Sequence, residues 1–375
     1  MSAERPGEIK ALAGARALPP LMIVLYHFFI FHHAVPASRV LGPPIAKGYL
    51  WVEFFFVLSG FVLTHVYGAR ARELWRPTAF FAFLKARLAR LYPVHLATLL
   101  SILMLMGALR ALDPTAYASI YEGPHAPLNT PATFIANLLL VQAWNIVPDL
   151  TWNSVAWFVS VEFLLCLLFP LYLLASRGGT VRGLVLIVAG LSWLAVLAVP
   201  SHVGLDITFD NGIFRGMAEF GIGVGMATVQ RAVADHATER VCSAAQAAAL
   251  AFFFWALAFS GPDHTPADLW TAAAEAALVF VLAFDRGFLA RALAHPVPLK
   301  LGEWSYGIYM GQMFWLQLAR YGEQNGWISA AGWLEPLLLL VVCIGWGALL
   351  ARFVEQPASA RLRRVFAQGK RAHPS

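Results

Sequence analysis

The chain of 375 residues is 59% hydrophobic and only 13% charged, with a mean hydropathy of +0.65. A soluble domain is normally about 25% charged, so this composition excludes an ordinary soluble enzyme and indicates a polytopic membrane protein. A net charge of +6 and a pI near 9.4 would suit a nucleic-acid binder if the chain were soluble, but here we expect them to reflect membrane topology, with no nucleic-acid partner.

Apolar segments of bilayer length follow one another along the whole chain. We predict ten spanning helices, near residues 17–34, 48–67, 91–110, 153–175, 183–200, 213–230, 241–260, 269–284, 301–319 and 333–353. The first segment carries a histidine and lacks a convincing small-residue cleavage site, so we interpret it as a retained anchor and not a signal peptide. The predicted fold class is all-α, a polytopic integral-membrane helical bundle. It forms a single domain over residues 1–375, without a visible internal repeat and with a basic tail from about 355.

The distribution of Lys and Arg predicts the orientation of this bundle. The segment between the second and third spans has one acidic residue, Glu73, against Arg70, Arg72, Arg76, Lys85, Arg87 and Arg90, and is therefore predicted to be cytoplasmic. An eleventh, shorter apolar run lies at 132–146. The later loops that contain Lys and Arg all fall on the cytoplasmic side only if this run does not cross the membrane. We therefore predict a re-entrant or interfacial segment at 132–146 and cytoplasmic N- and C-termini.

The first span, from Gly14 to Phe31, contains a basic residue and a histidine that are eleven residues apart, Arg16 and His27. In a continuous helix this spacing is close to three turns, which places both side chains on one face, about 16 Å apart along the axis. Ionisable groups in a membrane segment are costly, so this face suggests a functional site. A structural role is the alternative for each residue alone, because Arg16 can snorkel to the headgroups and His27 can bond a neighbouring helix.

Polar residues recur in the second and third spans. Glu53 interrupts an aromatic and aliphatic run, in which Ser59-Gly60 is predicted to be a small pair for close helix packing. Arg87 and Arg90 belong to a basic stretch at the cytoplasmic mouth of the third span, where they suit either topology or the binding of a polyanion.

Further polar groups lie in the fourth and sixth predicted spans. Asn153 and Glu162 fall within the segment 151–170, and Arg215 and Glu219 are spaced to neutralise each other on one helix. The three cysteines lie in apolar runs without metal-ligand spacing, so neither a disulfide framework nor a metal site is predicted: Cys166, Cys242 and Cys343.

Taken in this order and spacing, these segments resemble the acyltransferase 3 family, the bacterial membrane acyltransferases that O-acylate carbohydrates and related acceptors. The resemblance covers almost the whole chain. It is carried by the Arg16–His27 pairing, WVEFFFVLSGF, ARLARLYP, WFVSVEF around Glu162, FRGMAEFGIG with Arg215, SYGIYM, and Glu355-Gln356-Pro357. The sequence departs from the family at Pro19-Pro20 in the first span, at Glu53 where an aspartate is common, at Phe158 in place of a serine, and at Gln312 in place of a histidine. A second catalytic histidine at 312 is therefore excluded.

The resemblance implies transfer of an acyl group, most often acetyl, from cytoplasmic acyl-coenzyme A to a hydroxyl of a carbohydrate or glycolipid. It also implies location in the bacterial cytoplasmic membrane, in contact with lipids. His27 is the expected general base, or a transient acyl carrier, because an imidazole titrates near neutral pH. Arg16, Arg87 and Arg90 are expected to bind the coenzyme A phosphates. We expect acyl-coenzyme A to be a co-substrate, with no permanently bound cofactor and no metal.

Three further residues, Glu53, Asn153 and Arg215, are expected to bind the acceptor, whereas Glu162 either orients His27 or binds the acceptor. A different class of function remains open, because the same buried charges would suit a transporter or flippase whose substrate or proton path they line. A membrane enzyme that uses a lipid-linked donor in place of coenzyme A is a second alternative.

Overall fold

The computed structural model describes residues 8–31, 43–123, 128–201, 203–261, 264–327 and 334–361, and every regular element in these ranges is helical. The all-α prediction is confirmed. The basic tail predicted from about 355 is described only as far as residue 361. His32 and His33, at the outer end of the first predicted span, lie outside the described residues.

The first half of the chain contains one long helix and several shorter ones. The helices are α1 (Lys10–Ala15), α2 (Leu18–Phe31), α4 (Pro43–Ala46), η1 (Gly48–Leu50), α5 (Trp51–Tyr67), η2 (Gly68–Arg70), η3 (Glu73–Trp75), α6 (Pro77–Leu112), α7 (Pro114–Tyr121), α8 (Pro131–Leu138), η4 (Ser154–Ala156) and α9 (Trp157–Ala175). The 36 residues of α6 extend far beyond the predicted span 91–110. The basic stretch with Arg87 and Arg90 lies within the first four turns of this helix.

The second half continues with further helices. They are α10 (Thr180–Ala198), α11 (Gly212–Val233), η5 (Ala234–His236), α12 (Glu239–Ser260), α13 (Asp268–Leu282), α14 (Phe288–Leu293), α15 (Pro296–Gln324), α16 (Leu334–Leu350) and η6 (Ala351–Glu355), the last of which is a π-helical turn.

In the described part of the chain, seven helical segments are long and apolar enough to cross a membrane: residues 10–31, 48–70, 77–112, 154–175, 180–198, 239–260 and 334–361. The remaining three predicted spans correspond to helices α11, α13 and α15, which do not meet the same criteria of length and composition. For α13 the reason is length, since its 15 residues rise only about 22 Å. The structure therefore shows a helical membrane bundle, and the count of ten spans is not confirmed.

The segment predicted as re-entrant, 132–146, contains only the eight-residue α8, which is too short to cross a bilayer. The chain then leaves the helix, and Leu140 and Asn145 adopt left-handed backbone conformations with φ of 58° and 57°. Side chains tie this irregular backbone to η4 and α9, because Gln142 Nε2 donates to the Ala156 carbonyl at 3.1 Å and Trp144 Nε1 donates to the Ser160 carbonyl at 3.0 Å. Irregular backbone in a membrane protein is tolerated where it is buried in protein in this way.

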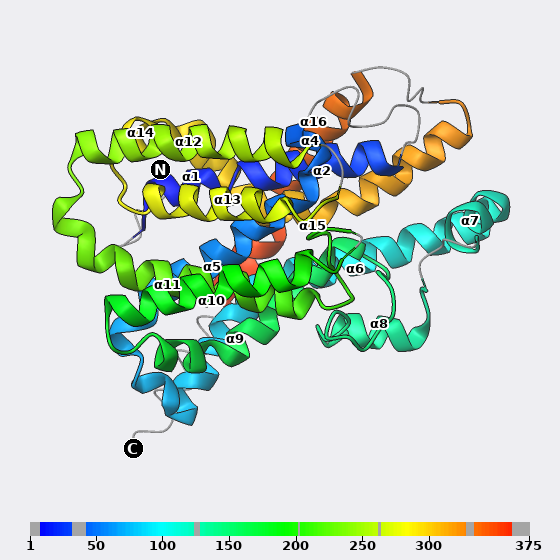
Figure 1. Ribbon diagram of the computed structural model, residues 1–375. Coiled ribbons are helices and arrows are strands. Elements are labelled where there is room, and N and C mark those ends of the chain that lie inside the picture. Colours follow the sequence, from blue (N-terminus) through cyan, green and yellow to red (C-terminus); the bar gives the residue numbers. More distant parts are fainter. Residues whose placement is uncertain are drawn as a thin grey trace.

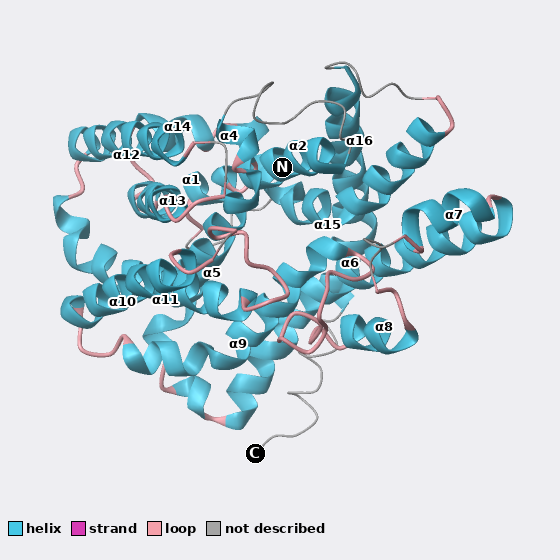
Figure 2. Cartoon of the chain, turned by 45° about the vertical axis from the view of Figure 1, so that its right-hand side comes forward, coloured by secondary structure: helices cyan, strands magenta, loops and turns pink. Residues whose placement is uncertain are grey.

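The helices form two groups joined by long diagonal helices (Figures 1 and 2). Helices α1, α12, α13 and α14 lie together, and α5, α9, α10 and α11 form the second group. Helix α15 contacts α2, α6 and α16. The close approach of α5 and α11 depends on glycine: a Cβ at Gly60 would stand 2.1 Å from the Phe220 carbonyl oxygen, and one at Gly223 would stand 2.0 Å from that of Val57.

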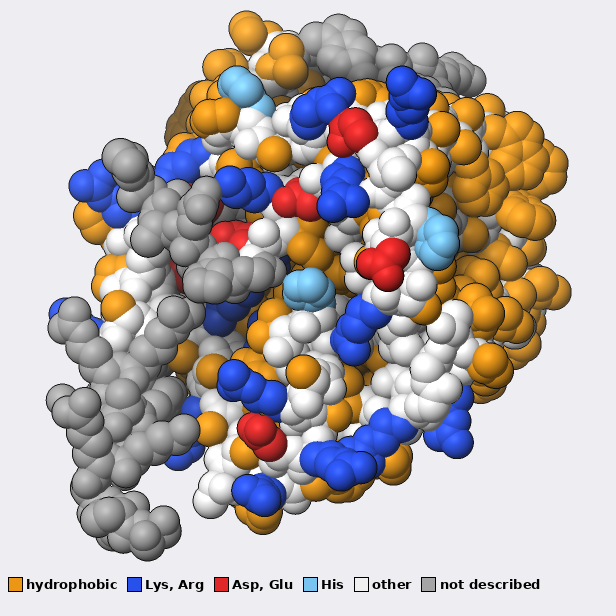
Figure 3. All heavy atoms as spheres, turned by 90° about the vertical axis from the view of Figure 1, so that its left-hand side faces the viewer, with side chains coloured by type: hydrophobic (Ala, Val, Ile, Leu, Met, Phe, Trp, Pro, Cys, Tyr) orange, Lys and Arg blue, Asp and Glu red, His pale blue; other side chains and the backbone are white. Residues whose placement is uncertain are grey.

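Lysine and arginine side chains gather on the end of the bundle that lies at the left of Figure 1, beside an apolar flank (Figure 3). This is the end at which α14 lies.

Candidate active site

Two cavities within the bundle contain most of the predicted site residues. The arginine cavity is lined by Arg16, Phe55, Leu58, Ser59, Val62, Leu63, Arg87, Arg90, Leu91, Phe158, Glu162, Ser305, Tyr306 and Tyr309. The histidine cavity is lined by Ile23, Tyr26, His27, Ile30, Tyr49, Val52, Leu150, Ser154, Val155, Trp157, Val203, Asp206, Thr208, Phe209, Asp210, Arg215 and Tyr309. Tyr309 lines both, so it stands where the two cavities meet.

The first helix is broken between the two predicted catalytic residues. Helix α1 ends at Ala15 with Arg16 as its C-cap, and α2 starts at Leu18. Pro19 and Pro20 occupy the first turn of α2, where a missing backbone N–H is tolerated. The prediction that Arg16 and His27 share a face of one continuous helix is therefore wrong. Arg16 lines the arginine cavity and His27 lines the histidine cavity.

The imidazole of His27 is held by a partner that the sequence did not suggest. His27 Nδ1 lies 2.8 Å from Gln312 Oε1 on α15, and Gln312 Nε2 donates to the Tyr309 carbonyl oxygen at 2.8 Å. Because the second bond assigns the amide nitrogen of Gln312, its Oε1 must accept from Nδ1–H of His27. In the neutral imidazole the other ring nitrogen, Nε2, then carries no proton and can act as a base.

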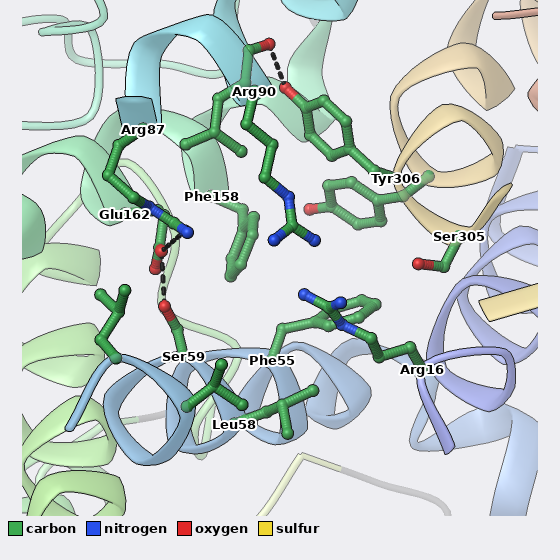
Figure 4. Close-up of a pocket in the computed structure, with 14 residues that line it drawn as sticks. Arg16, Phe55, Leu58, Ser59, Arg87, Arg90, Phe158, Glu162, Ser305 and Tyr306 are labelled. Atoms are coloured by element: carbon green, nitrogen blue, oxygen red, sulfur yellow. Dashed lines mark hydrogen bonds and ion pairs between the residues drawn. The ribbon is translucent and has the colours of Figure 1, made fainter. Parts of the chain in front are cut away.

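Three arginines converge in the arginine cavity. Arg16 and Arg90 extend their guanidinium groups toward each other from opposite walls (Figure 4), and Arg87 lies beside them on the same helix as Arg90. Glu162 is the acidic residue in the lining, so the lining charge is two positive units, three minus one. A cavity of this kind attracts a ligand with several negative charges.

Glu162 does not contact His27. Its Oε1 accepts from Ser59 Oγ at 2.5 Å and from Arg87 Nη2 at 3.1 Å, both within the arginine cavity (Figure 4). The prediction that Glu162 orients His27 is therefore wrong. The prediction that Ser59 serves only for packing is wrong too, whereas Gly60 does form the close packing contact with α11.

Arg215 lines the histidine cavity from within a buried ion-pair cluster. Its guanidinium donates to Glu53 Oε1 at 2.9 Å, to Glu219 Oε1 at 3.3 Å, and to the backbone carbonyls of Ile207 and Tyr49, each at 3.1 Å. Glu53 is fully buried and is not part of the cavity lining. Its place is therefore behind Arg215, which it neutralises, and the prediction that it contacts the acceptor is not supported by the geometry.

Asn153 lines neither cavity. Its Nδ2 donates to Thr98 Oγ1 at 3.0 Å and to the Met310 carbonyl at 2.9 Å, which ties the start of α9 to α6 and α15. A buried amide in an apolar bundle takes the nearest acceptors. The geometry therefore gives Asn153 a structural role and does not support the prediction that it binds the acceptor.

Two carboxylates share the lining of the histidine cavity with His27. Asp206 and Asp210 line the histidine cavity, and Asp206 Oδ2 lies 3.3 Å from His264 Nε2. Tyr49, also in the lining, donates to Asp268 Oδ2 at 2.8 Å, and Asp268 forms an ion pair with the buried Lys47. Nothing in the sequence spacing indicates these contacts, because Lys47 and Asp268 are 221 residues apart.

Among the described residues no group of three or more His, Cys, Asp or Glu side chains could hold a metal ion. The cysteines Cys166, Cys242 and Cys343 are free and buried.

The structure thus defines a helical membrane bundle that contains a basic cavity and, in a second cavity, an imidazole oriented by Gln312. The sequence profile of the acyltransferase 3 family, described as an acyltransferase domain, matches residues 9–352, and the chain belongs to this family. It is therefore a membrane acyltransferase. The resemblance expected from the motifs is confirmed.

Two relatives extend this comparison. The chain is 28% identical to acyltransferase MdmB of Streptomyces mycarofaciens over 95% of its length and 93% of the relative. It is 33% identical to protein 2 in the picA locus of Rhizobium radiobacter over 41% of its own length and 84% of the relative. No solved structure gives a significant match to the chain.

Proposed function

We propose that this acyltransferase moves an acyl group, most often acetyl, from acyl-coenzyme A to a hydroxyl of a carbohydrate or glycolipid, with His27 as general base. The observation that carries the proposal is the meeting of the two cavities at Tyr309, since one cavity is basic and the other contains an imidazole with a free basic nitrogen. The donor occupies the arginine cavity and the acceptor occupies the histidine cavity.

The arginine cavity suits the phosphates of coenzyme A. Guanidinium groups form planar, charge-assisted hydrogen bonds to phosphate oxygens, and Arg16 and Arg90 aim theirs into the same space (Figure 4). Arg87 forms an ion pair with Glu162, whereas Arg16 and Arg90 extend into the cavity from opposite walls.

The histidine cavity suits the reacting hydroxyl. His27 Nε2 takes the hydroxyl proton as the oxygen attacks the thioester carbonyl, the C–S bond breaks, and the electron pair leaves with the sulfur of coenzyme A. The cavity has a volume of about 350 Å³, and its lining includes the aromatic side chains of Tyr26, Tyr49 and Trp157. Such a lining, with a few placed polar groups, is typical of a site for an organic ligand.

The positive end of the bundle supports a location in the bacterial inner membrane with both termini cytoplasmic. In this orientation the donor enters from the cytoplasm.

The test is release of coenzyme A thiol by detergent-purified, monodisperse protein supplied with acetyl-coenzyme A and a panel of sugar acceptors, with the acylated product identified by mass spectrometry. Acceptor-dependent thiol release supports the proposal. Acylation that requires a lipid-linked donor, with acyl-coenzyme A left intact, would contradict the proposed donor.

A further inference from the structure

Only one of the two carboxylate oxygens of Glu162 has hydrogen-bond partners among the described residues. Oε1 accepts from Ser59 and Arg87, whereas Oε2 is buried and has no hydrogen-bond partner in the described part of the chain. The residue is only 3% exposed. An unsatisfied buried acceptor is costly, and a carboxylate paired with a guanidinium can only accept, so Oε2 can take an N–H or O–H donor from a ligand in the arginine cavity.

The position of this carboxylate relative to Tyr309 is defined by two helices. Phe158 precedes Glu162 by one turn on α9, and Phe55 precedes Ser59 by one turn on α5. Both phenylalanine rings pack against Tyr309, with centroids 5.7 and 6.1 Å from it. The Glu162–Ser59 pair therefore lies about 6 Å, one helical turn, to the arginine-cavity side of the boundary between the cavities.

The remaining hydroxyls of the arginine cavity already donate to backbone carbonyls. Ser305 Oγ donates to Gly302 at 2.8 Å, Tyr306 to Leu91 at 2.7 Å, and Tyr309 to Val155 at 3.0 Å. Glu162 Oε2 is thus the unfilled carboxylate acceptor among the described side chains of this lining.

Coenzyme A thioesters have a matching donor. The amide nitrogen of the cysteamine unit is four bonds from the thioester carbonyl carbon, a reach of roughly 5 Å when extended. That reach is close to the one helical turn between Glu162 and the aromatic boundary. An amide N–H that lies among the apolar side chains of this lining, such as Phe55, Leu58 and Phe158, also needs an acceptor there.

We infer that Glu162 Oε2 accepts a hydrogen bond from the cysteamine amide N–H of the donor and thereby fixes how deep the thioester enters. With the amide on Glu162, the thioester carbonyl reaches the level of Phe55, Phe158 and Tyr309, facing the histidine cavity. Glu162 is then a positioning residue for the donor. This inference rests on the proposed function, because it takes acyl-coenzyme A as the donor.

The test compares acetyl-coenzyme A with its depsi analogue, in which an ester oxygen replaces the cysteamine N–H while the phosphates and the chain length are kept. Dissociation constants are measured by isothermal titration calorimetry on wild type, Glu162→Leu and Glu162→Gln, each purified and monodisperse. Wild type should bind the analogue about 10- to 100-fold more weakly, as expected for loss of a hydrogen bond to a charged acceptor. In Glu162→Leu the two ligands should bind within about threefold of each other, and Glu162→Gln, which keeps a neutral acceptor, should fall between.

Glu219→Gln is the matched control, because Glu219 is equally buried, is paired with an arginine, and also has an unpartnered Oε2, but lines neither cavity. It should keep the wild-type ratio. Equal affinity of wild type for the two ligands, or a wild-type ratio in Glu162→Leu, would overturn the inference while leaving the proposed function intact. Failure of wild type to bind acetyl-coenzyme A at all would contradict the proposed function itself. Since only a ratio of affinities is compared, a general structural effect of the substitution does not mimic the expected result.

Discussion

His27 and Gln312, 285 residues apart in the chain, form a 2.8 Å hydrogen bond that gives the imidazole a defined tautomer. Gln312→Leu should therefore lower kcat by about tenfold or more, a part of the roughly 10²–10⁴-fold contributed by a general base, while leaving the affinity for acyl-coenzyme A unchanged. Steady-state kinetics and donor titration on the same preparation separate the two effects. A raised dissociation constant with normal kcat would remove Gln312 from the catalytic arrangement.

Replacement of the base itself should have the largest effect. His27→Ala removes the group that takes the hydroxyl proton, so acyl transfer should fall by at least about 10²-fold with the protein folded and inserted. His65→Ala is the control, because His65 lies on α5, stacks on Phe61 and lines neither cavity. Transfer is measured with matched amounts of monodisperse protein. Turnover of His27→Ala at the wild-type rate would refute the proposed base.

Composition and loop charges were sufficient to predict the helical membrane class, because hydropathy and the location of Lys and Arg are local properties of the chain. The lengths of the helices were harder to predict from the sequence. The basic stretch with Arg87 and Arg90 reads as a loop by its charge, yet it forms the first turns of the 36-residue α6. Helix propensity of Arg, Lys and Leu outweighs the change in hydropathy there.

The composition of the site was predicted better than its arrangement. The three arginines expected to bind the donor line one cavity and His27 lines the other, and the sequence did not indicate this division. The hydrogen-bond partners of Glu162 and His27 could not be predicted from the sequence, because Ser59–Glu162 and His27–Gln312 are contacts between segments that are 103 and 285 residues apart. One sequence provides no information on such pairs.

The donor site is tested through its arginines. Arg90→Ala and Arg16→Ala should each raise the dissociation constant for acyl-coenzyme A, because each removes a phosphate contact. Arg16→Lys should recover only part of the loss, since an ammonium group lacks the planar fork of a guanidinium. Calorimetric titration with coenzyme A provides the measurement, and rising salt should weaken wild-type binding. Donor affinity unchanged in an Arg16→Ala/Arg90→Ala double variant would assign these residues to topology alone.

The buried cluster around Arg215 should control stability. Arg215→Met leaves Glu53 as an uncompensated buried carboxylate, which should cost about 3–5 kcal/mol. The double variant Arg215→Met/Glu53→Gln should recover much of this loss, because it removes the stranded charge as well. Thermal unfolding followed by tryptophan fluorescence in detergent gives the comparison. The exposed pair Lys300–Glu303 is the control, and Lys300→Met should cost less than about 1 kcal/mol. A double variant no more stable than the single one would show that Arg215 acts through other contacts.

The orientation in the membrane is tested at the two ends of α10. This predominantly apolar helix of 19 residues is long enough to cross, so residues just before and after it are expected on opposite sides. The three native cysteines are buried and should give little background labelling. Ser176 is buried, so the label is better placed at the neighbouring Arg177, with Ser201 as the second position. Because the basic loops predict a cytoplasmic start for α10, a membrane-impermeant maleimide applied to intact cells should label Ser201→Cys and should reach Arg177→Cys only after permeabilisation. The reverse pattern would place the arginine cavity on the outer side, away from cytoplasmic acyl-coenzyme A, and would contradict the proposed route of the donor.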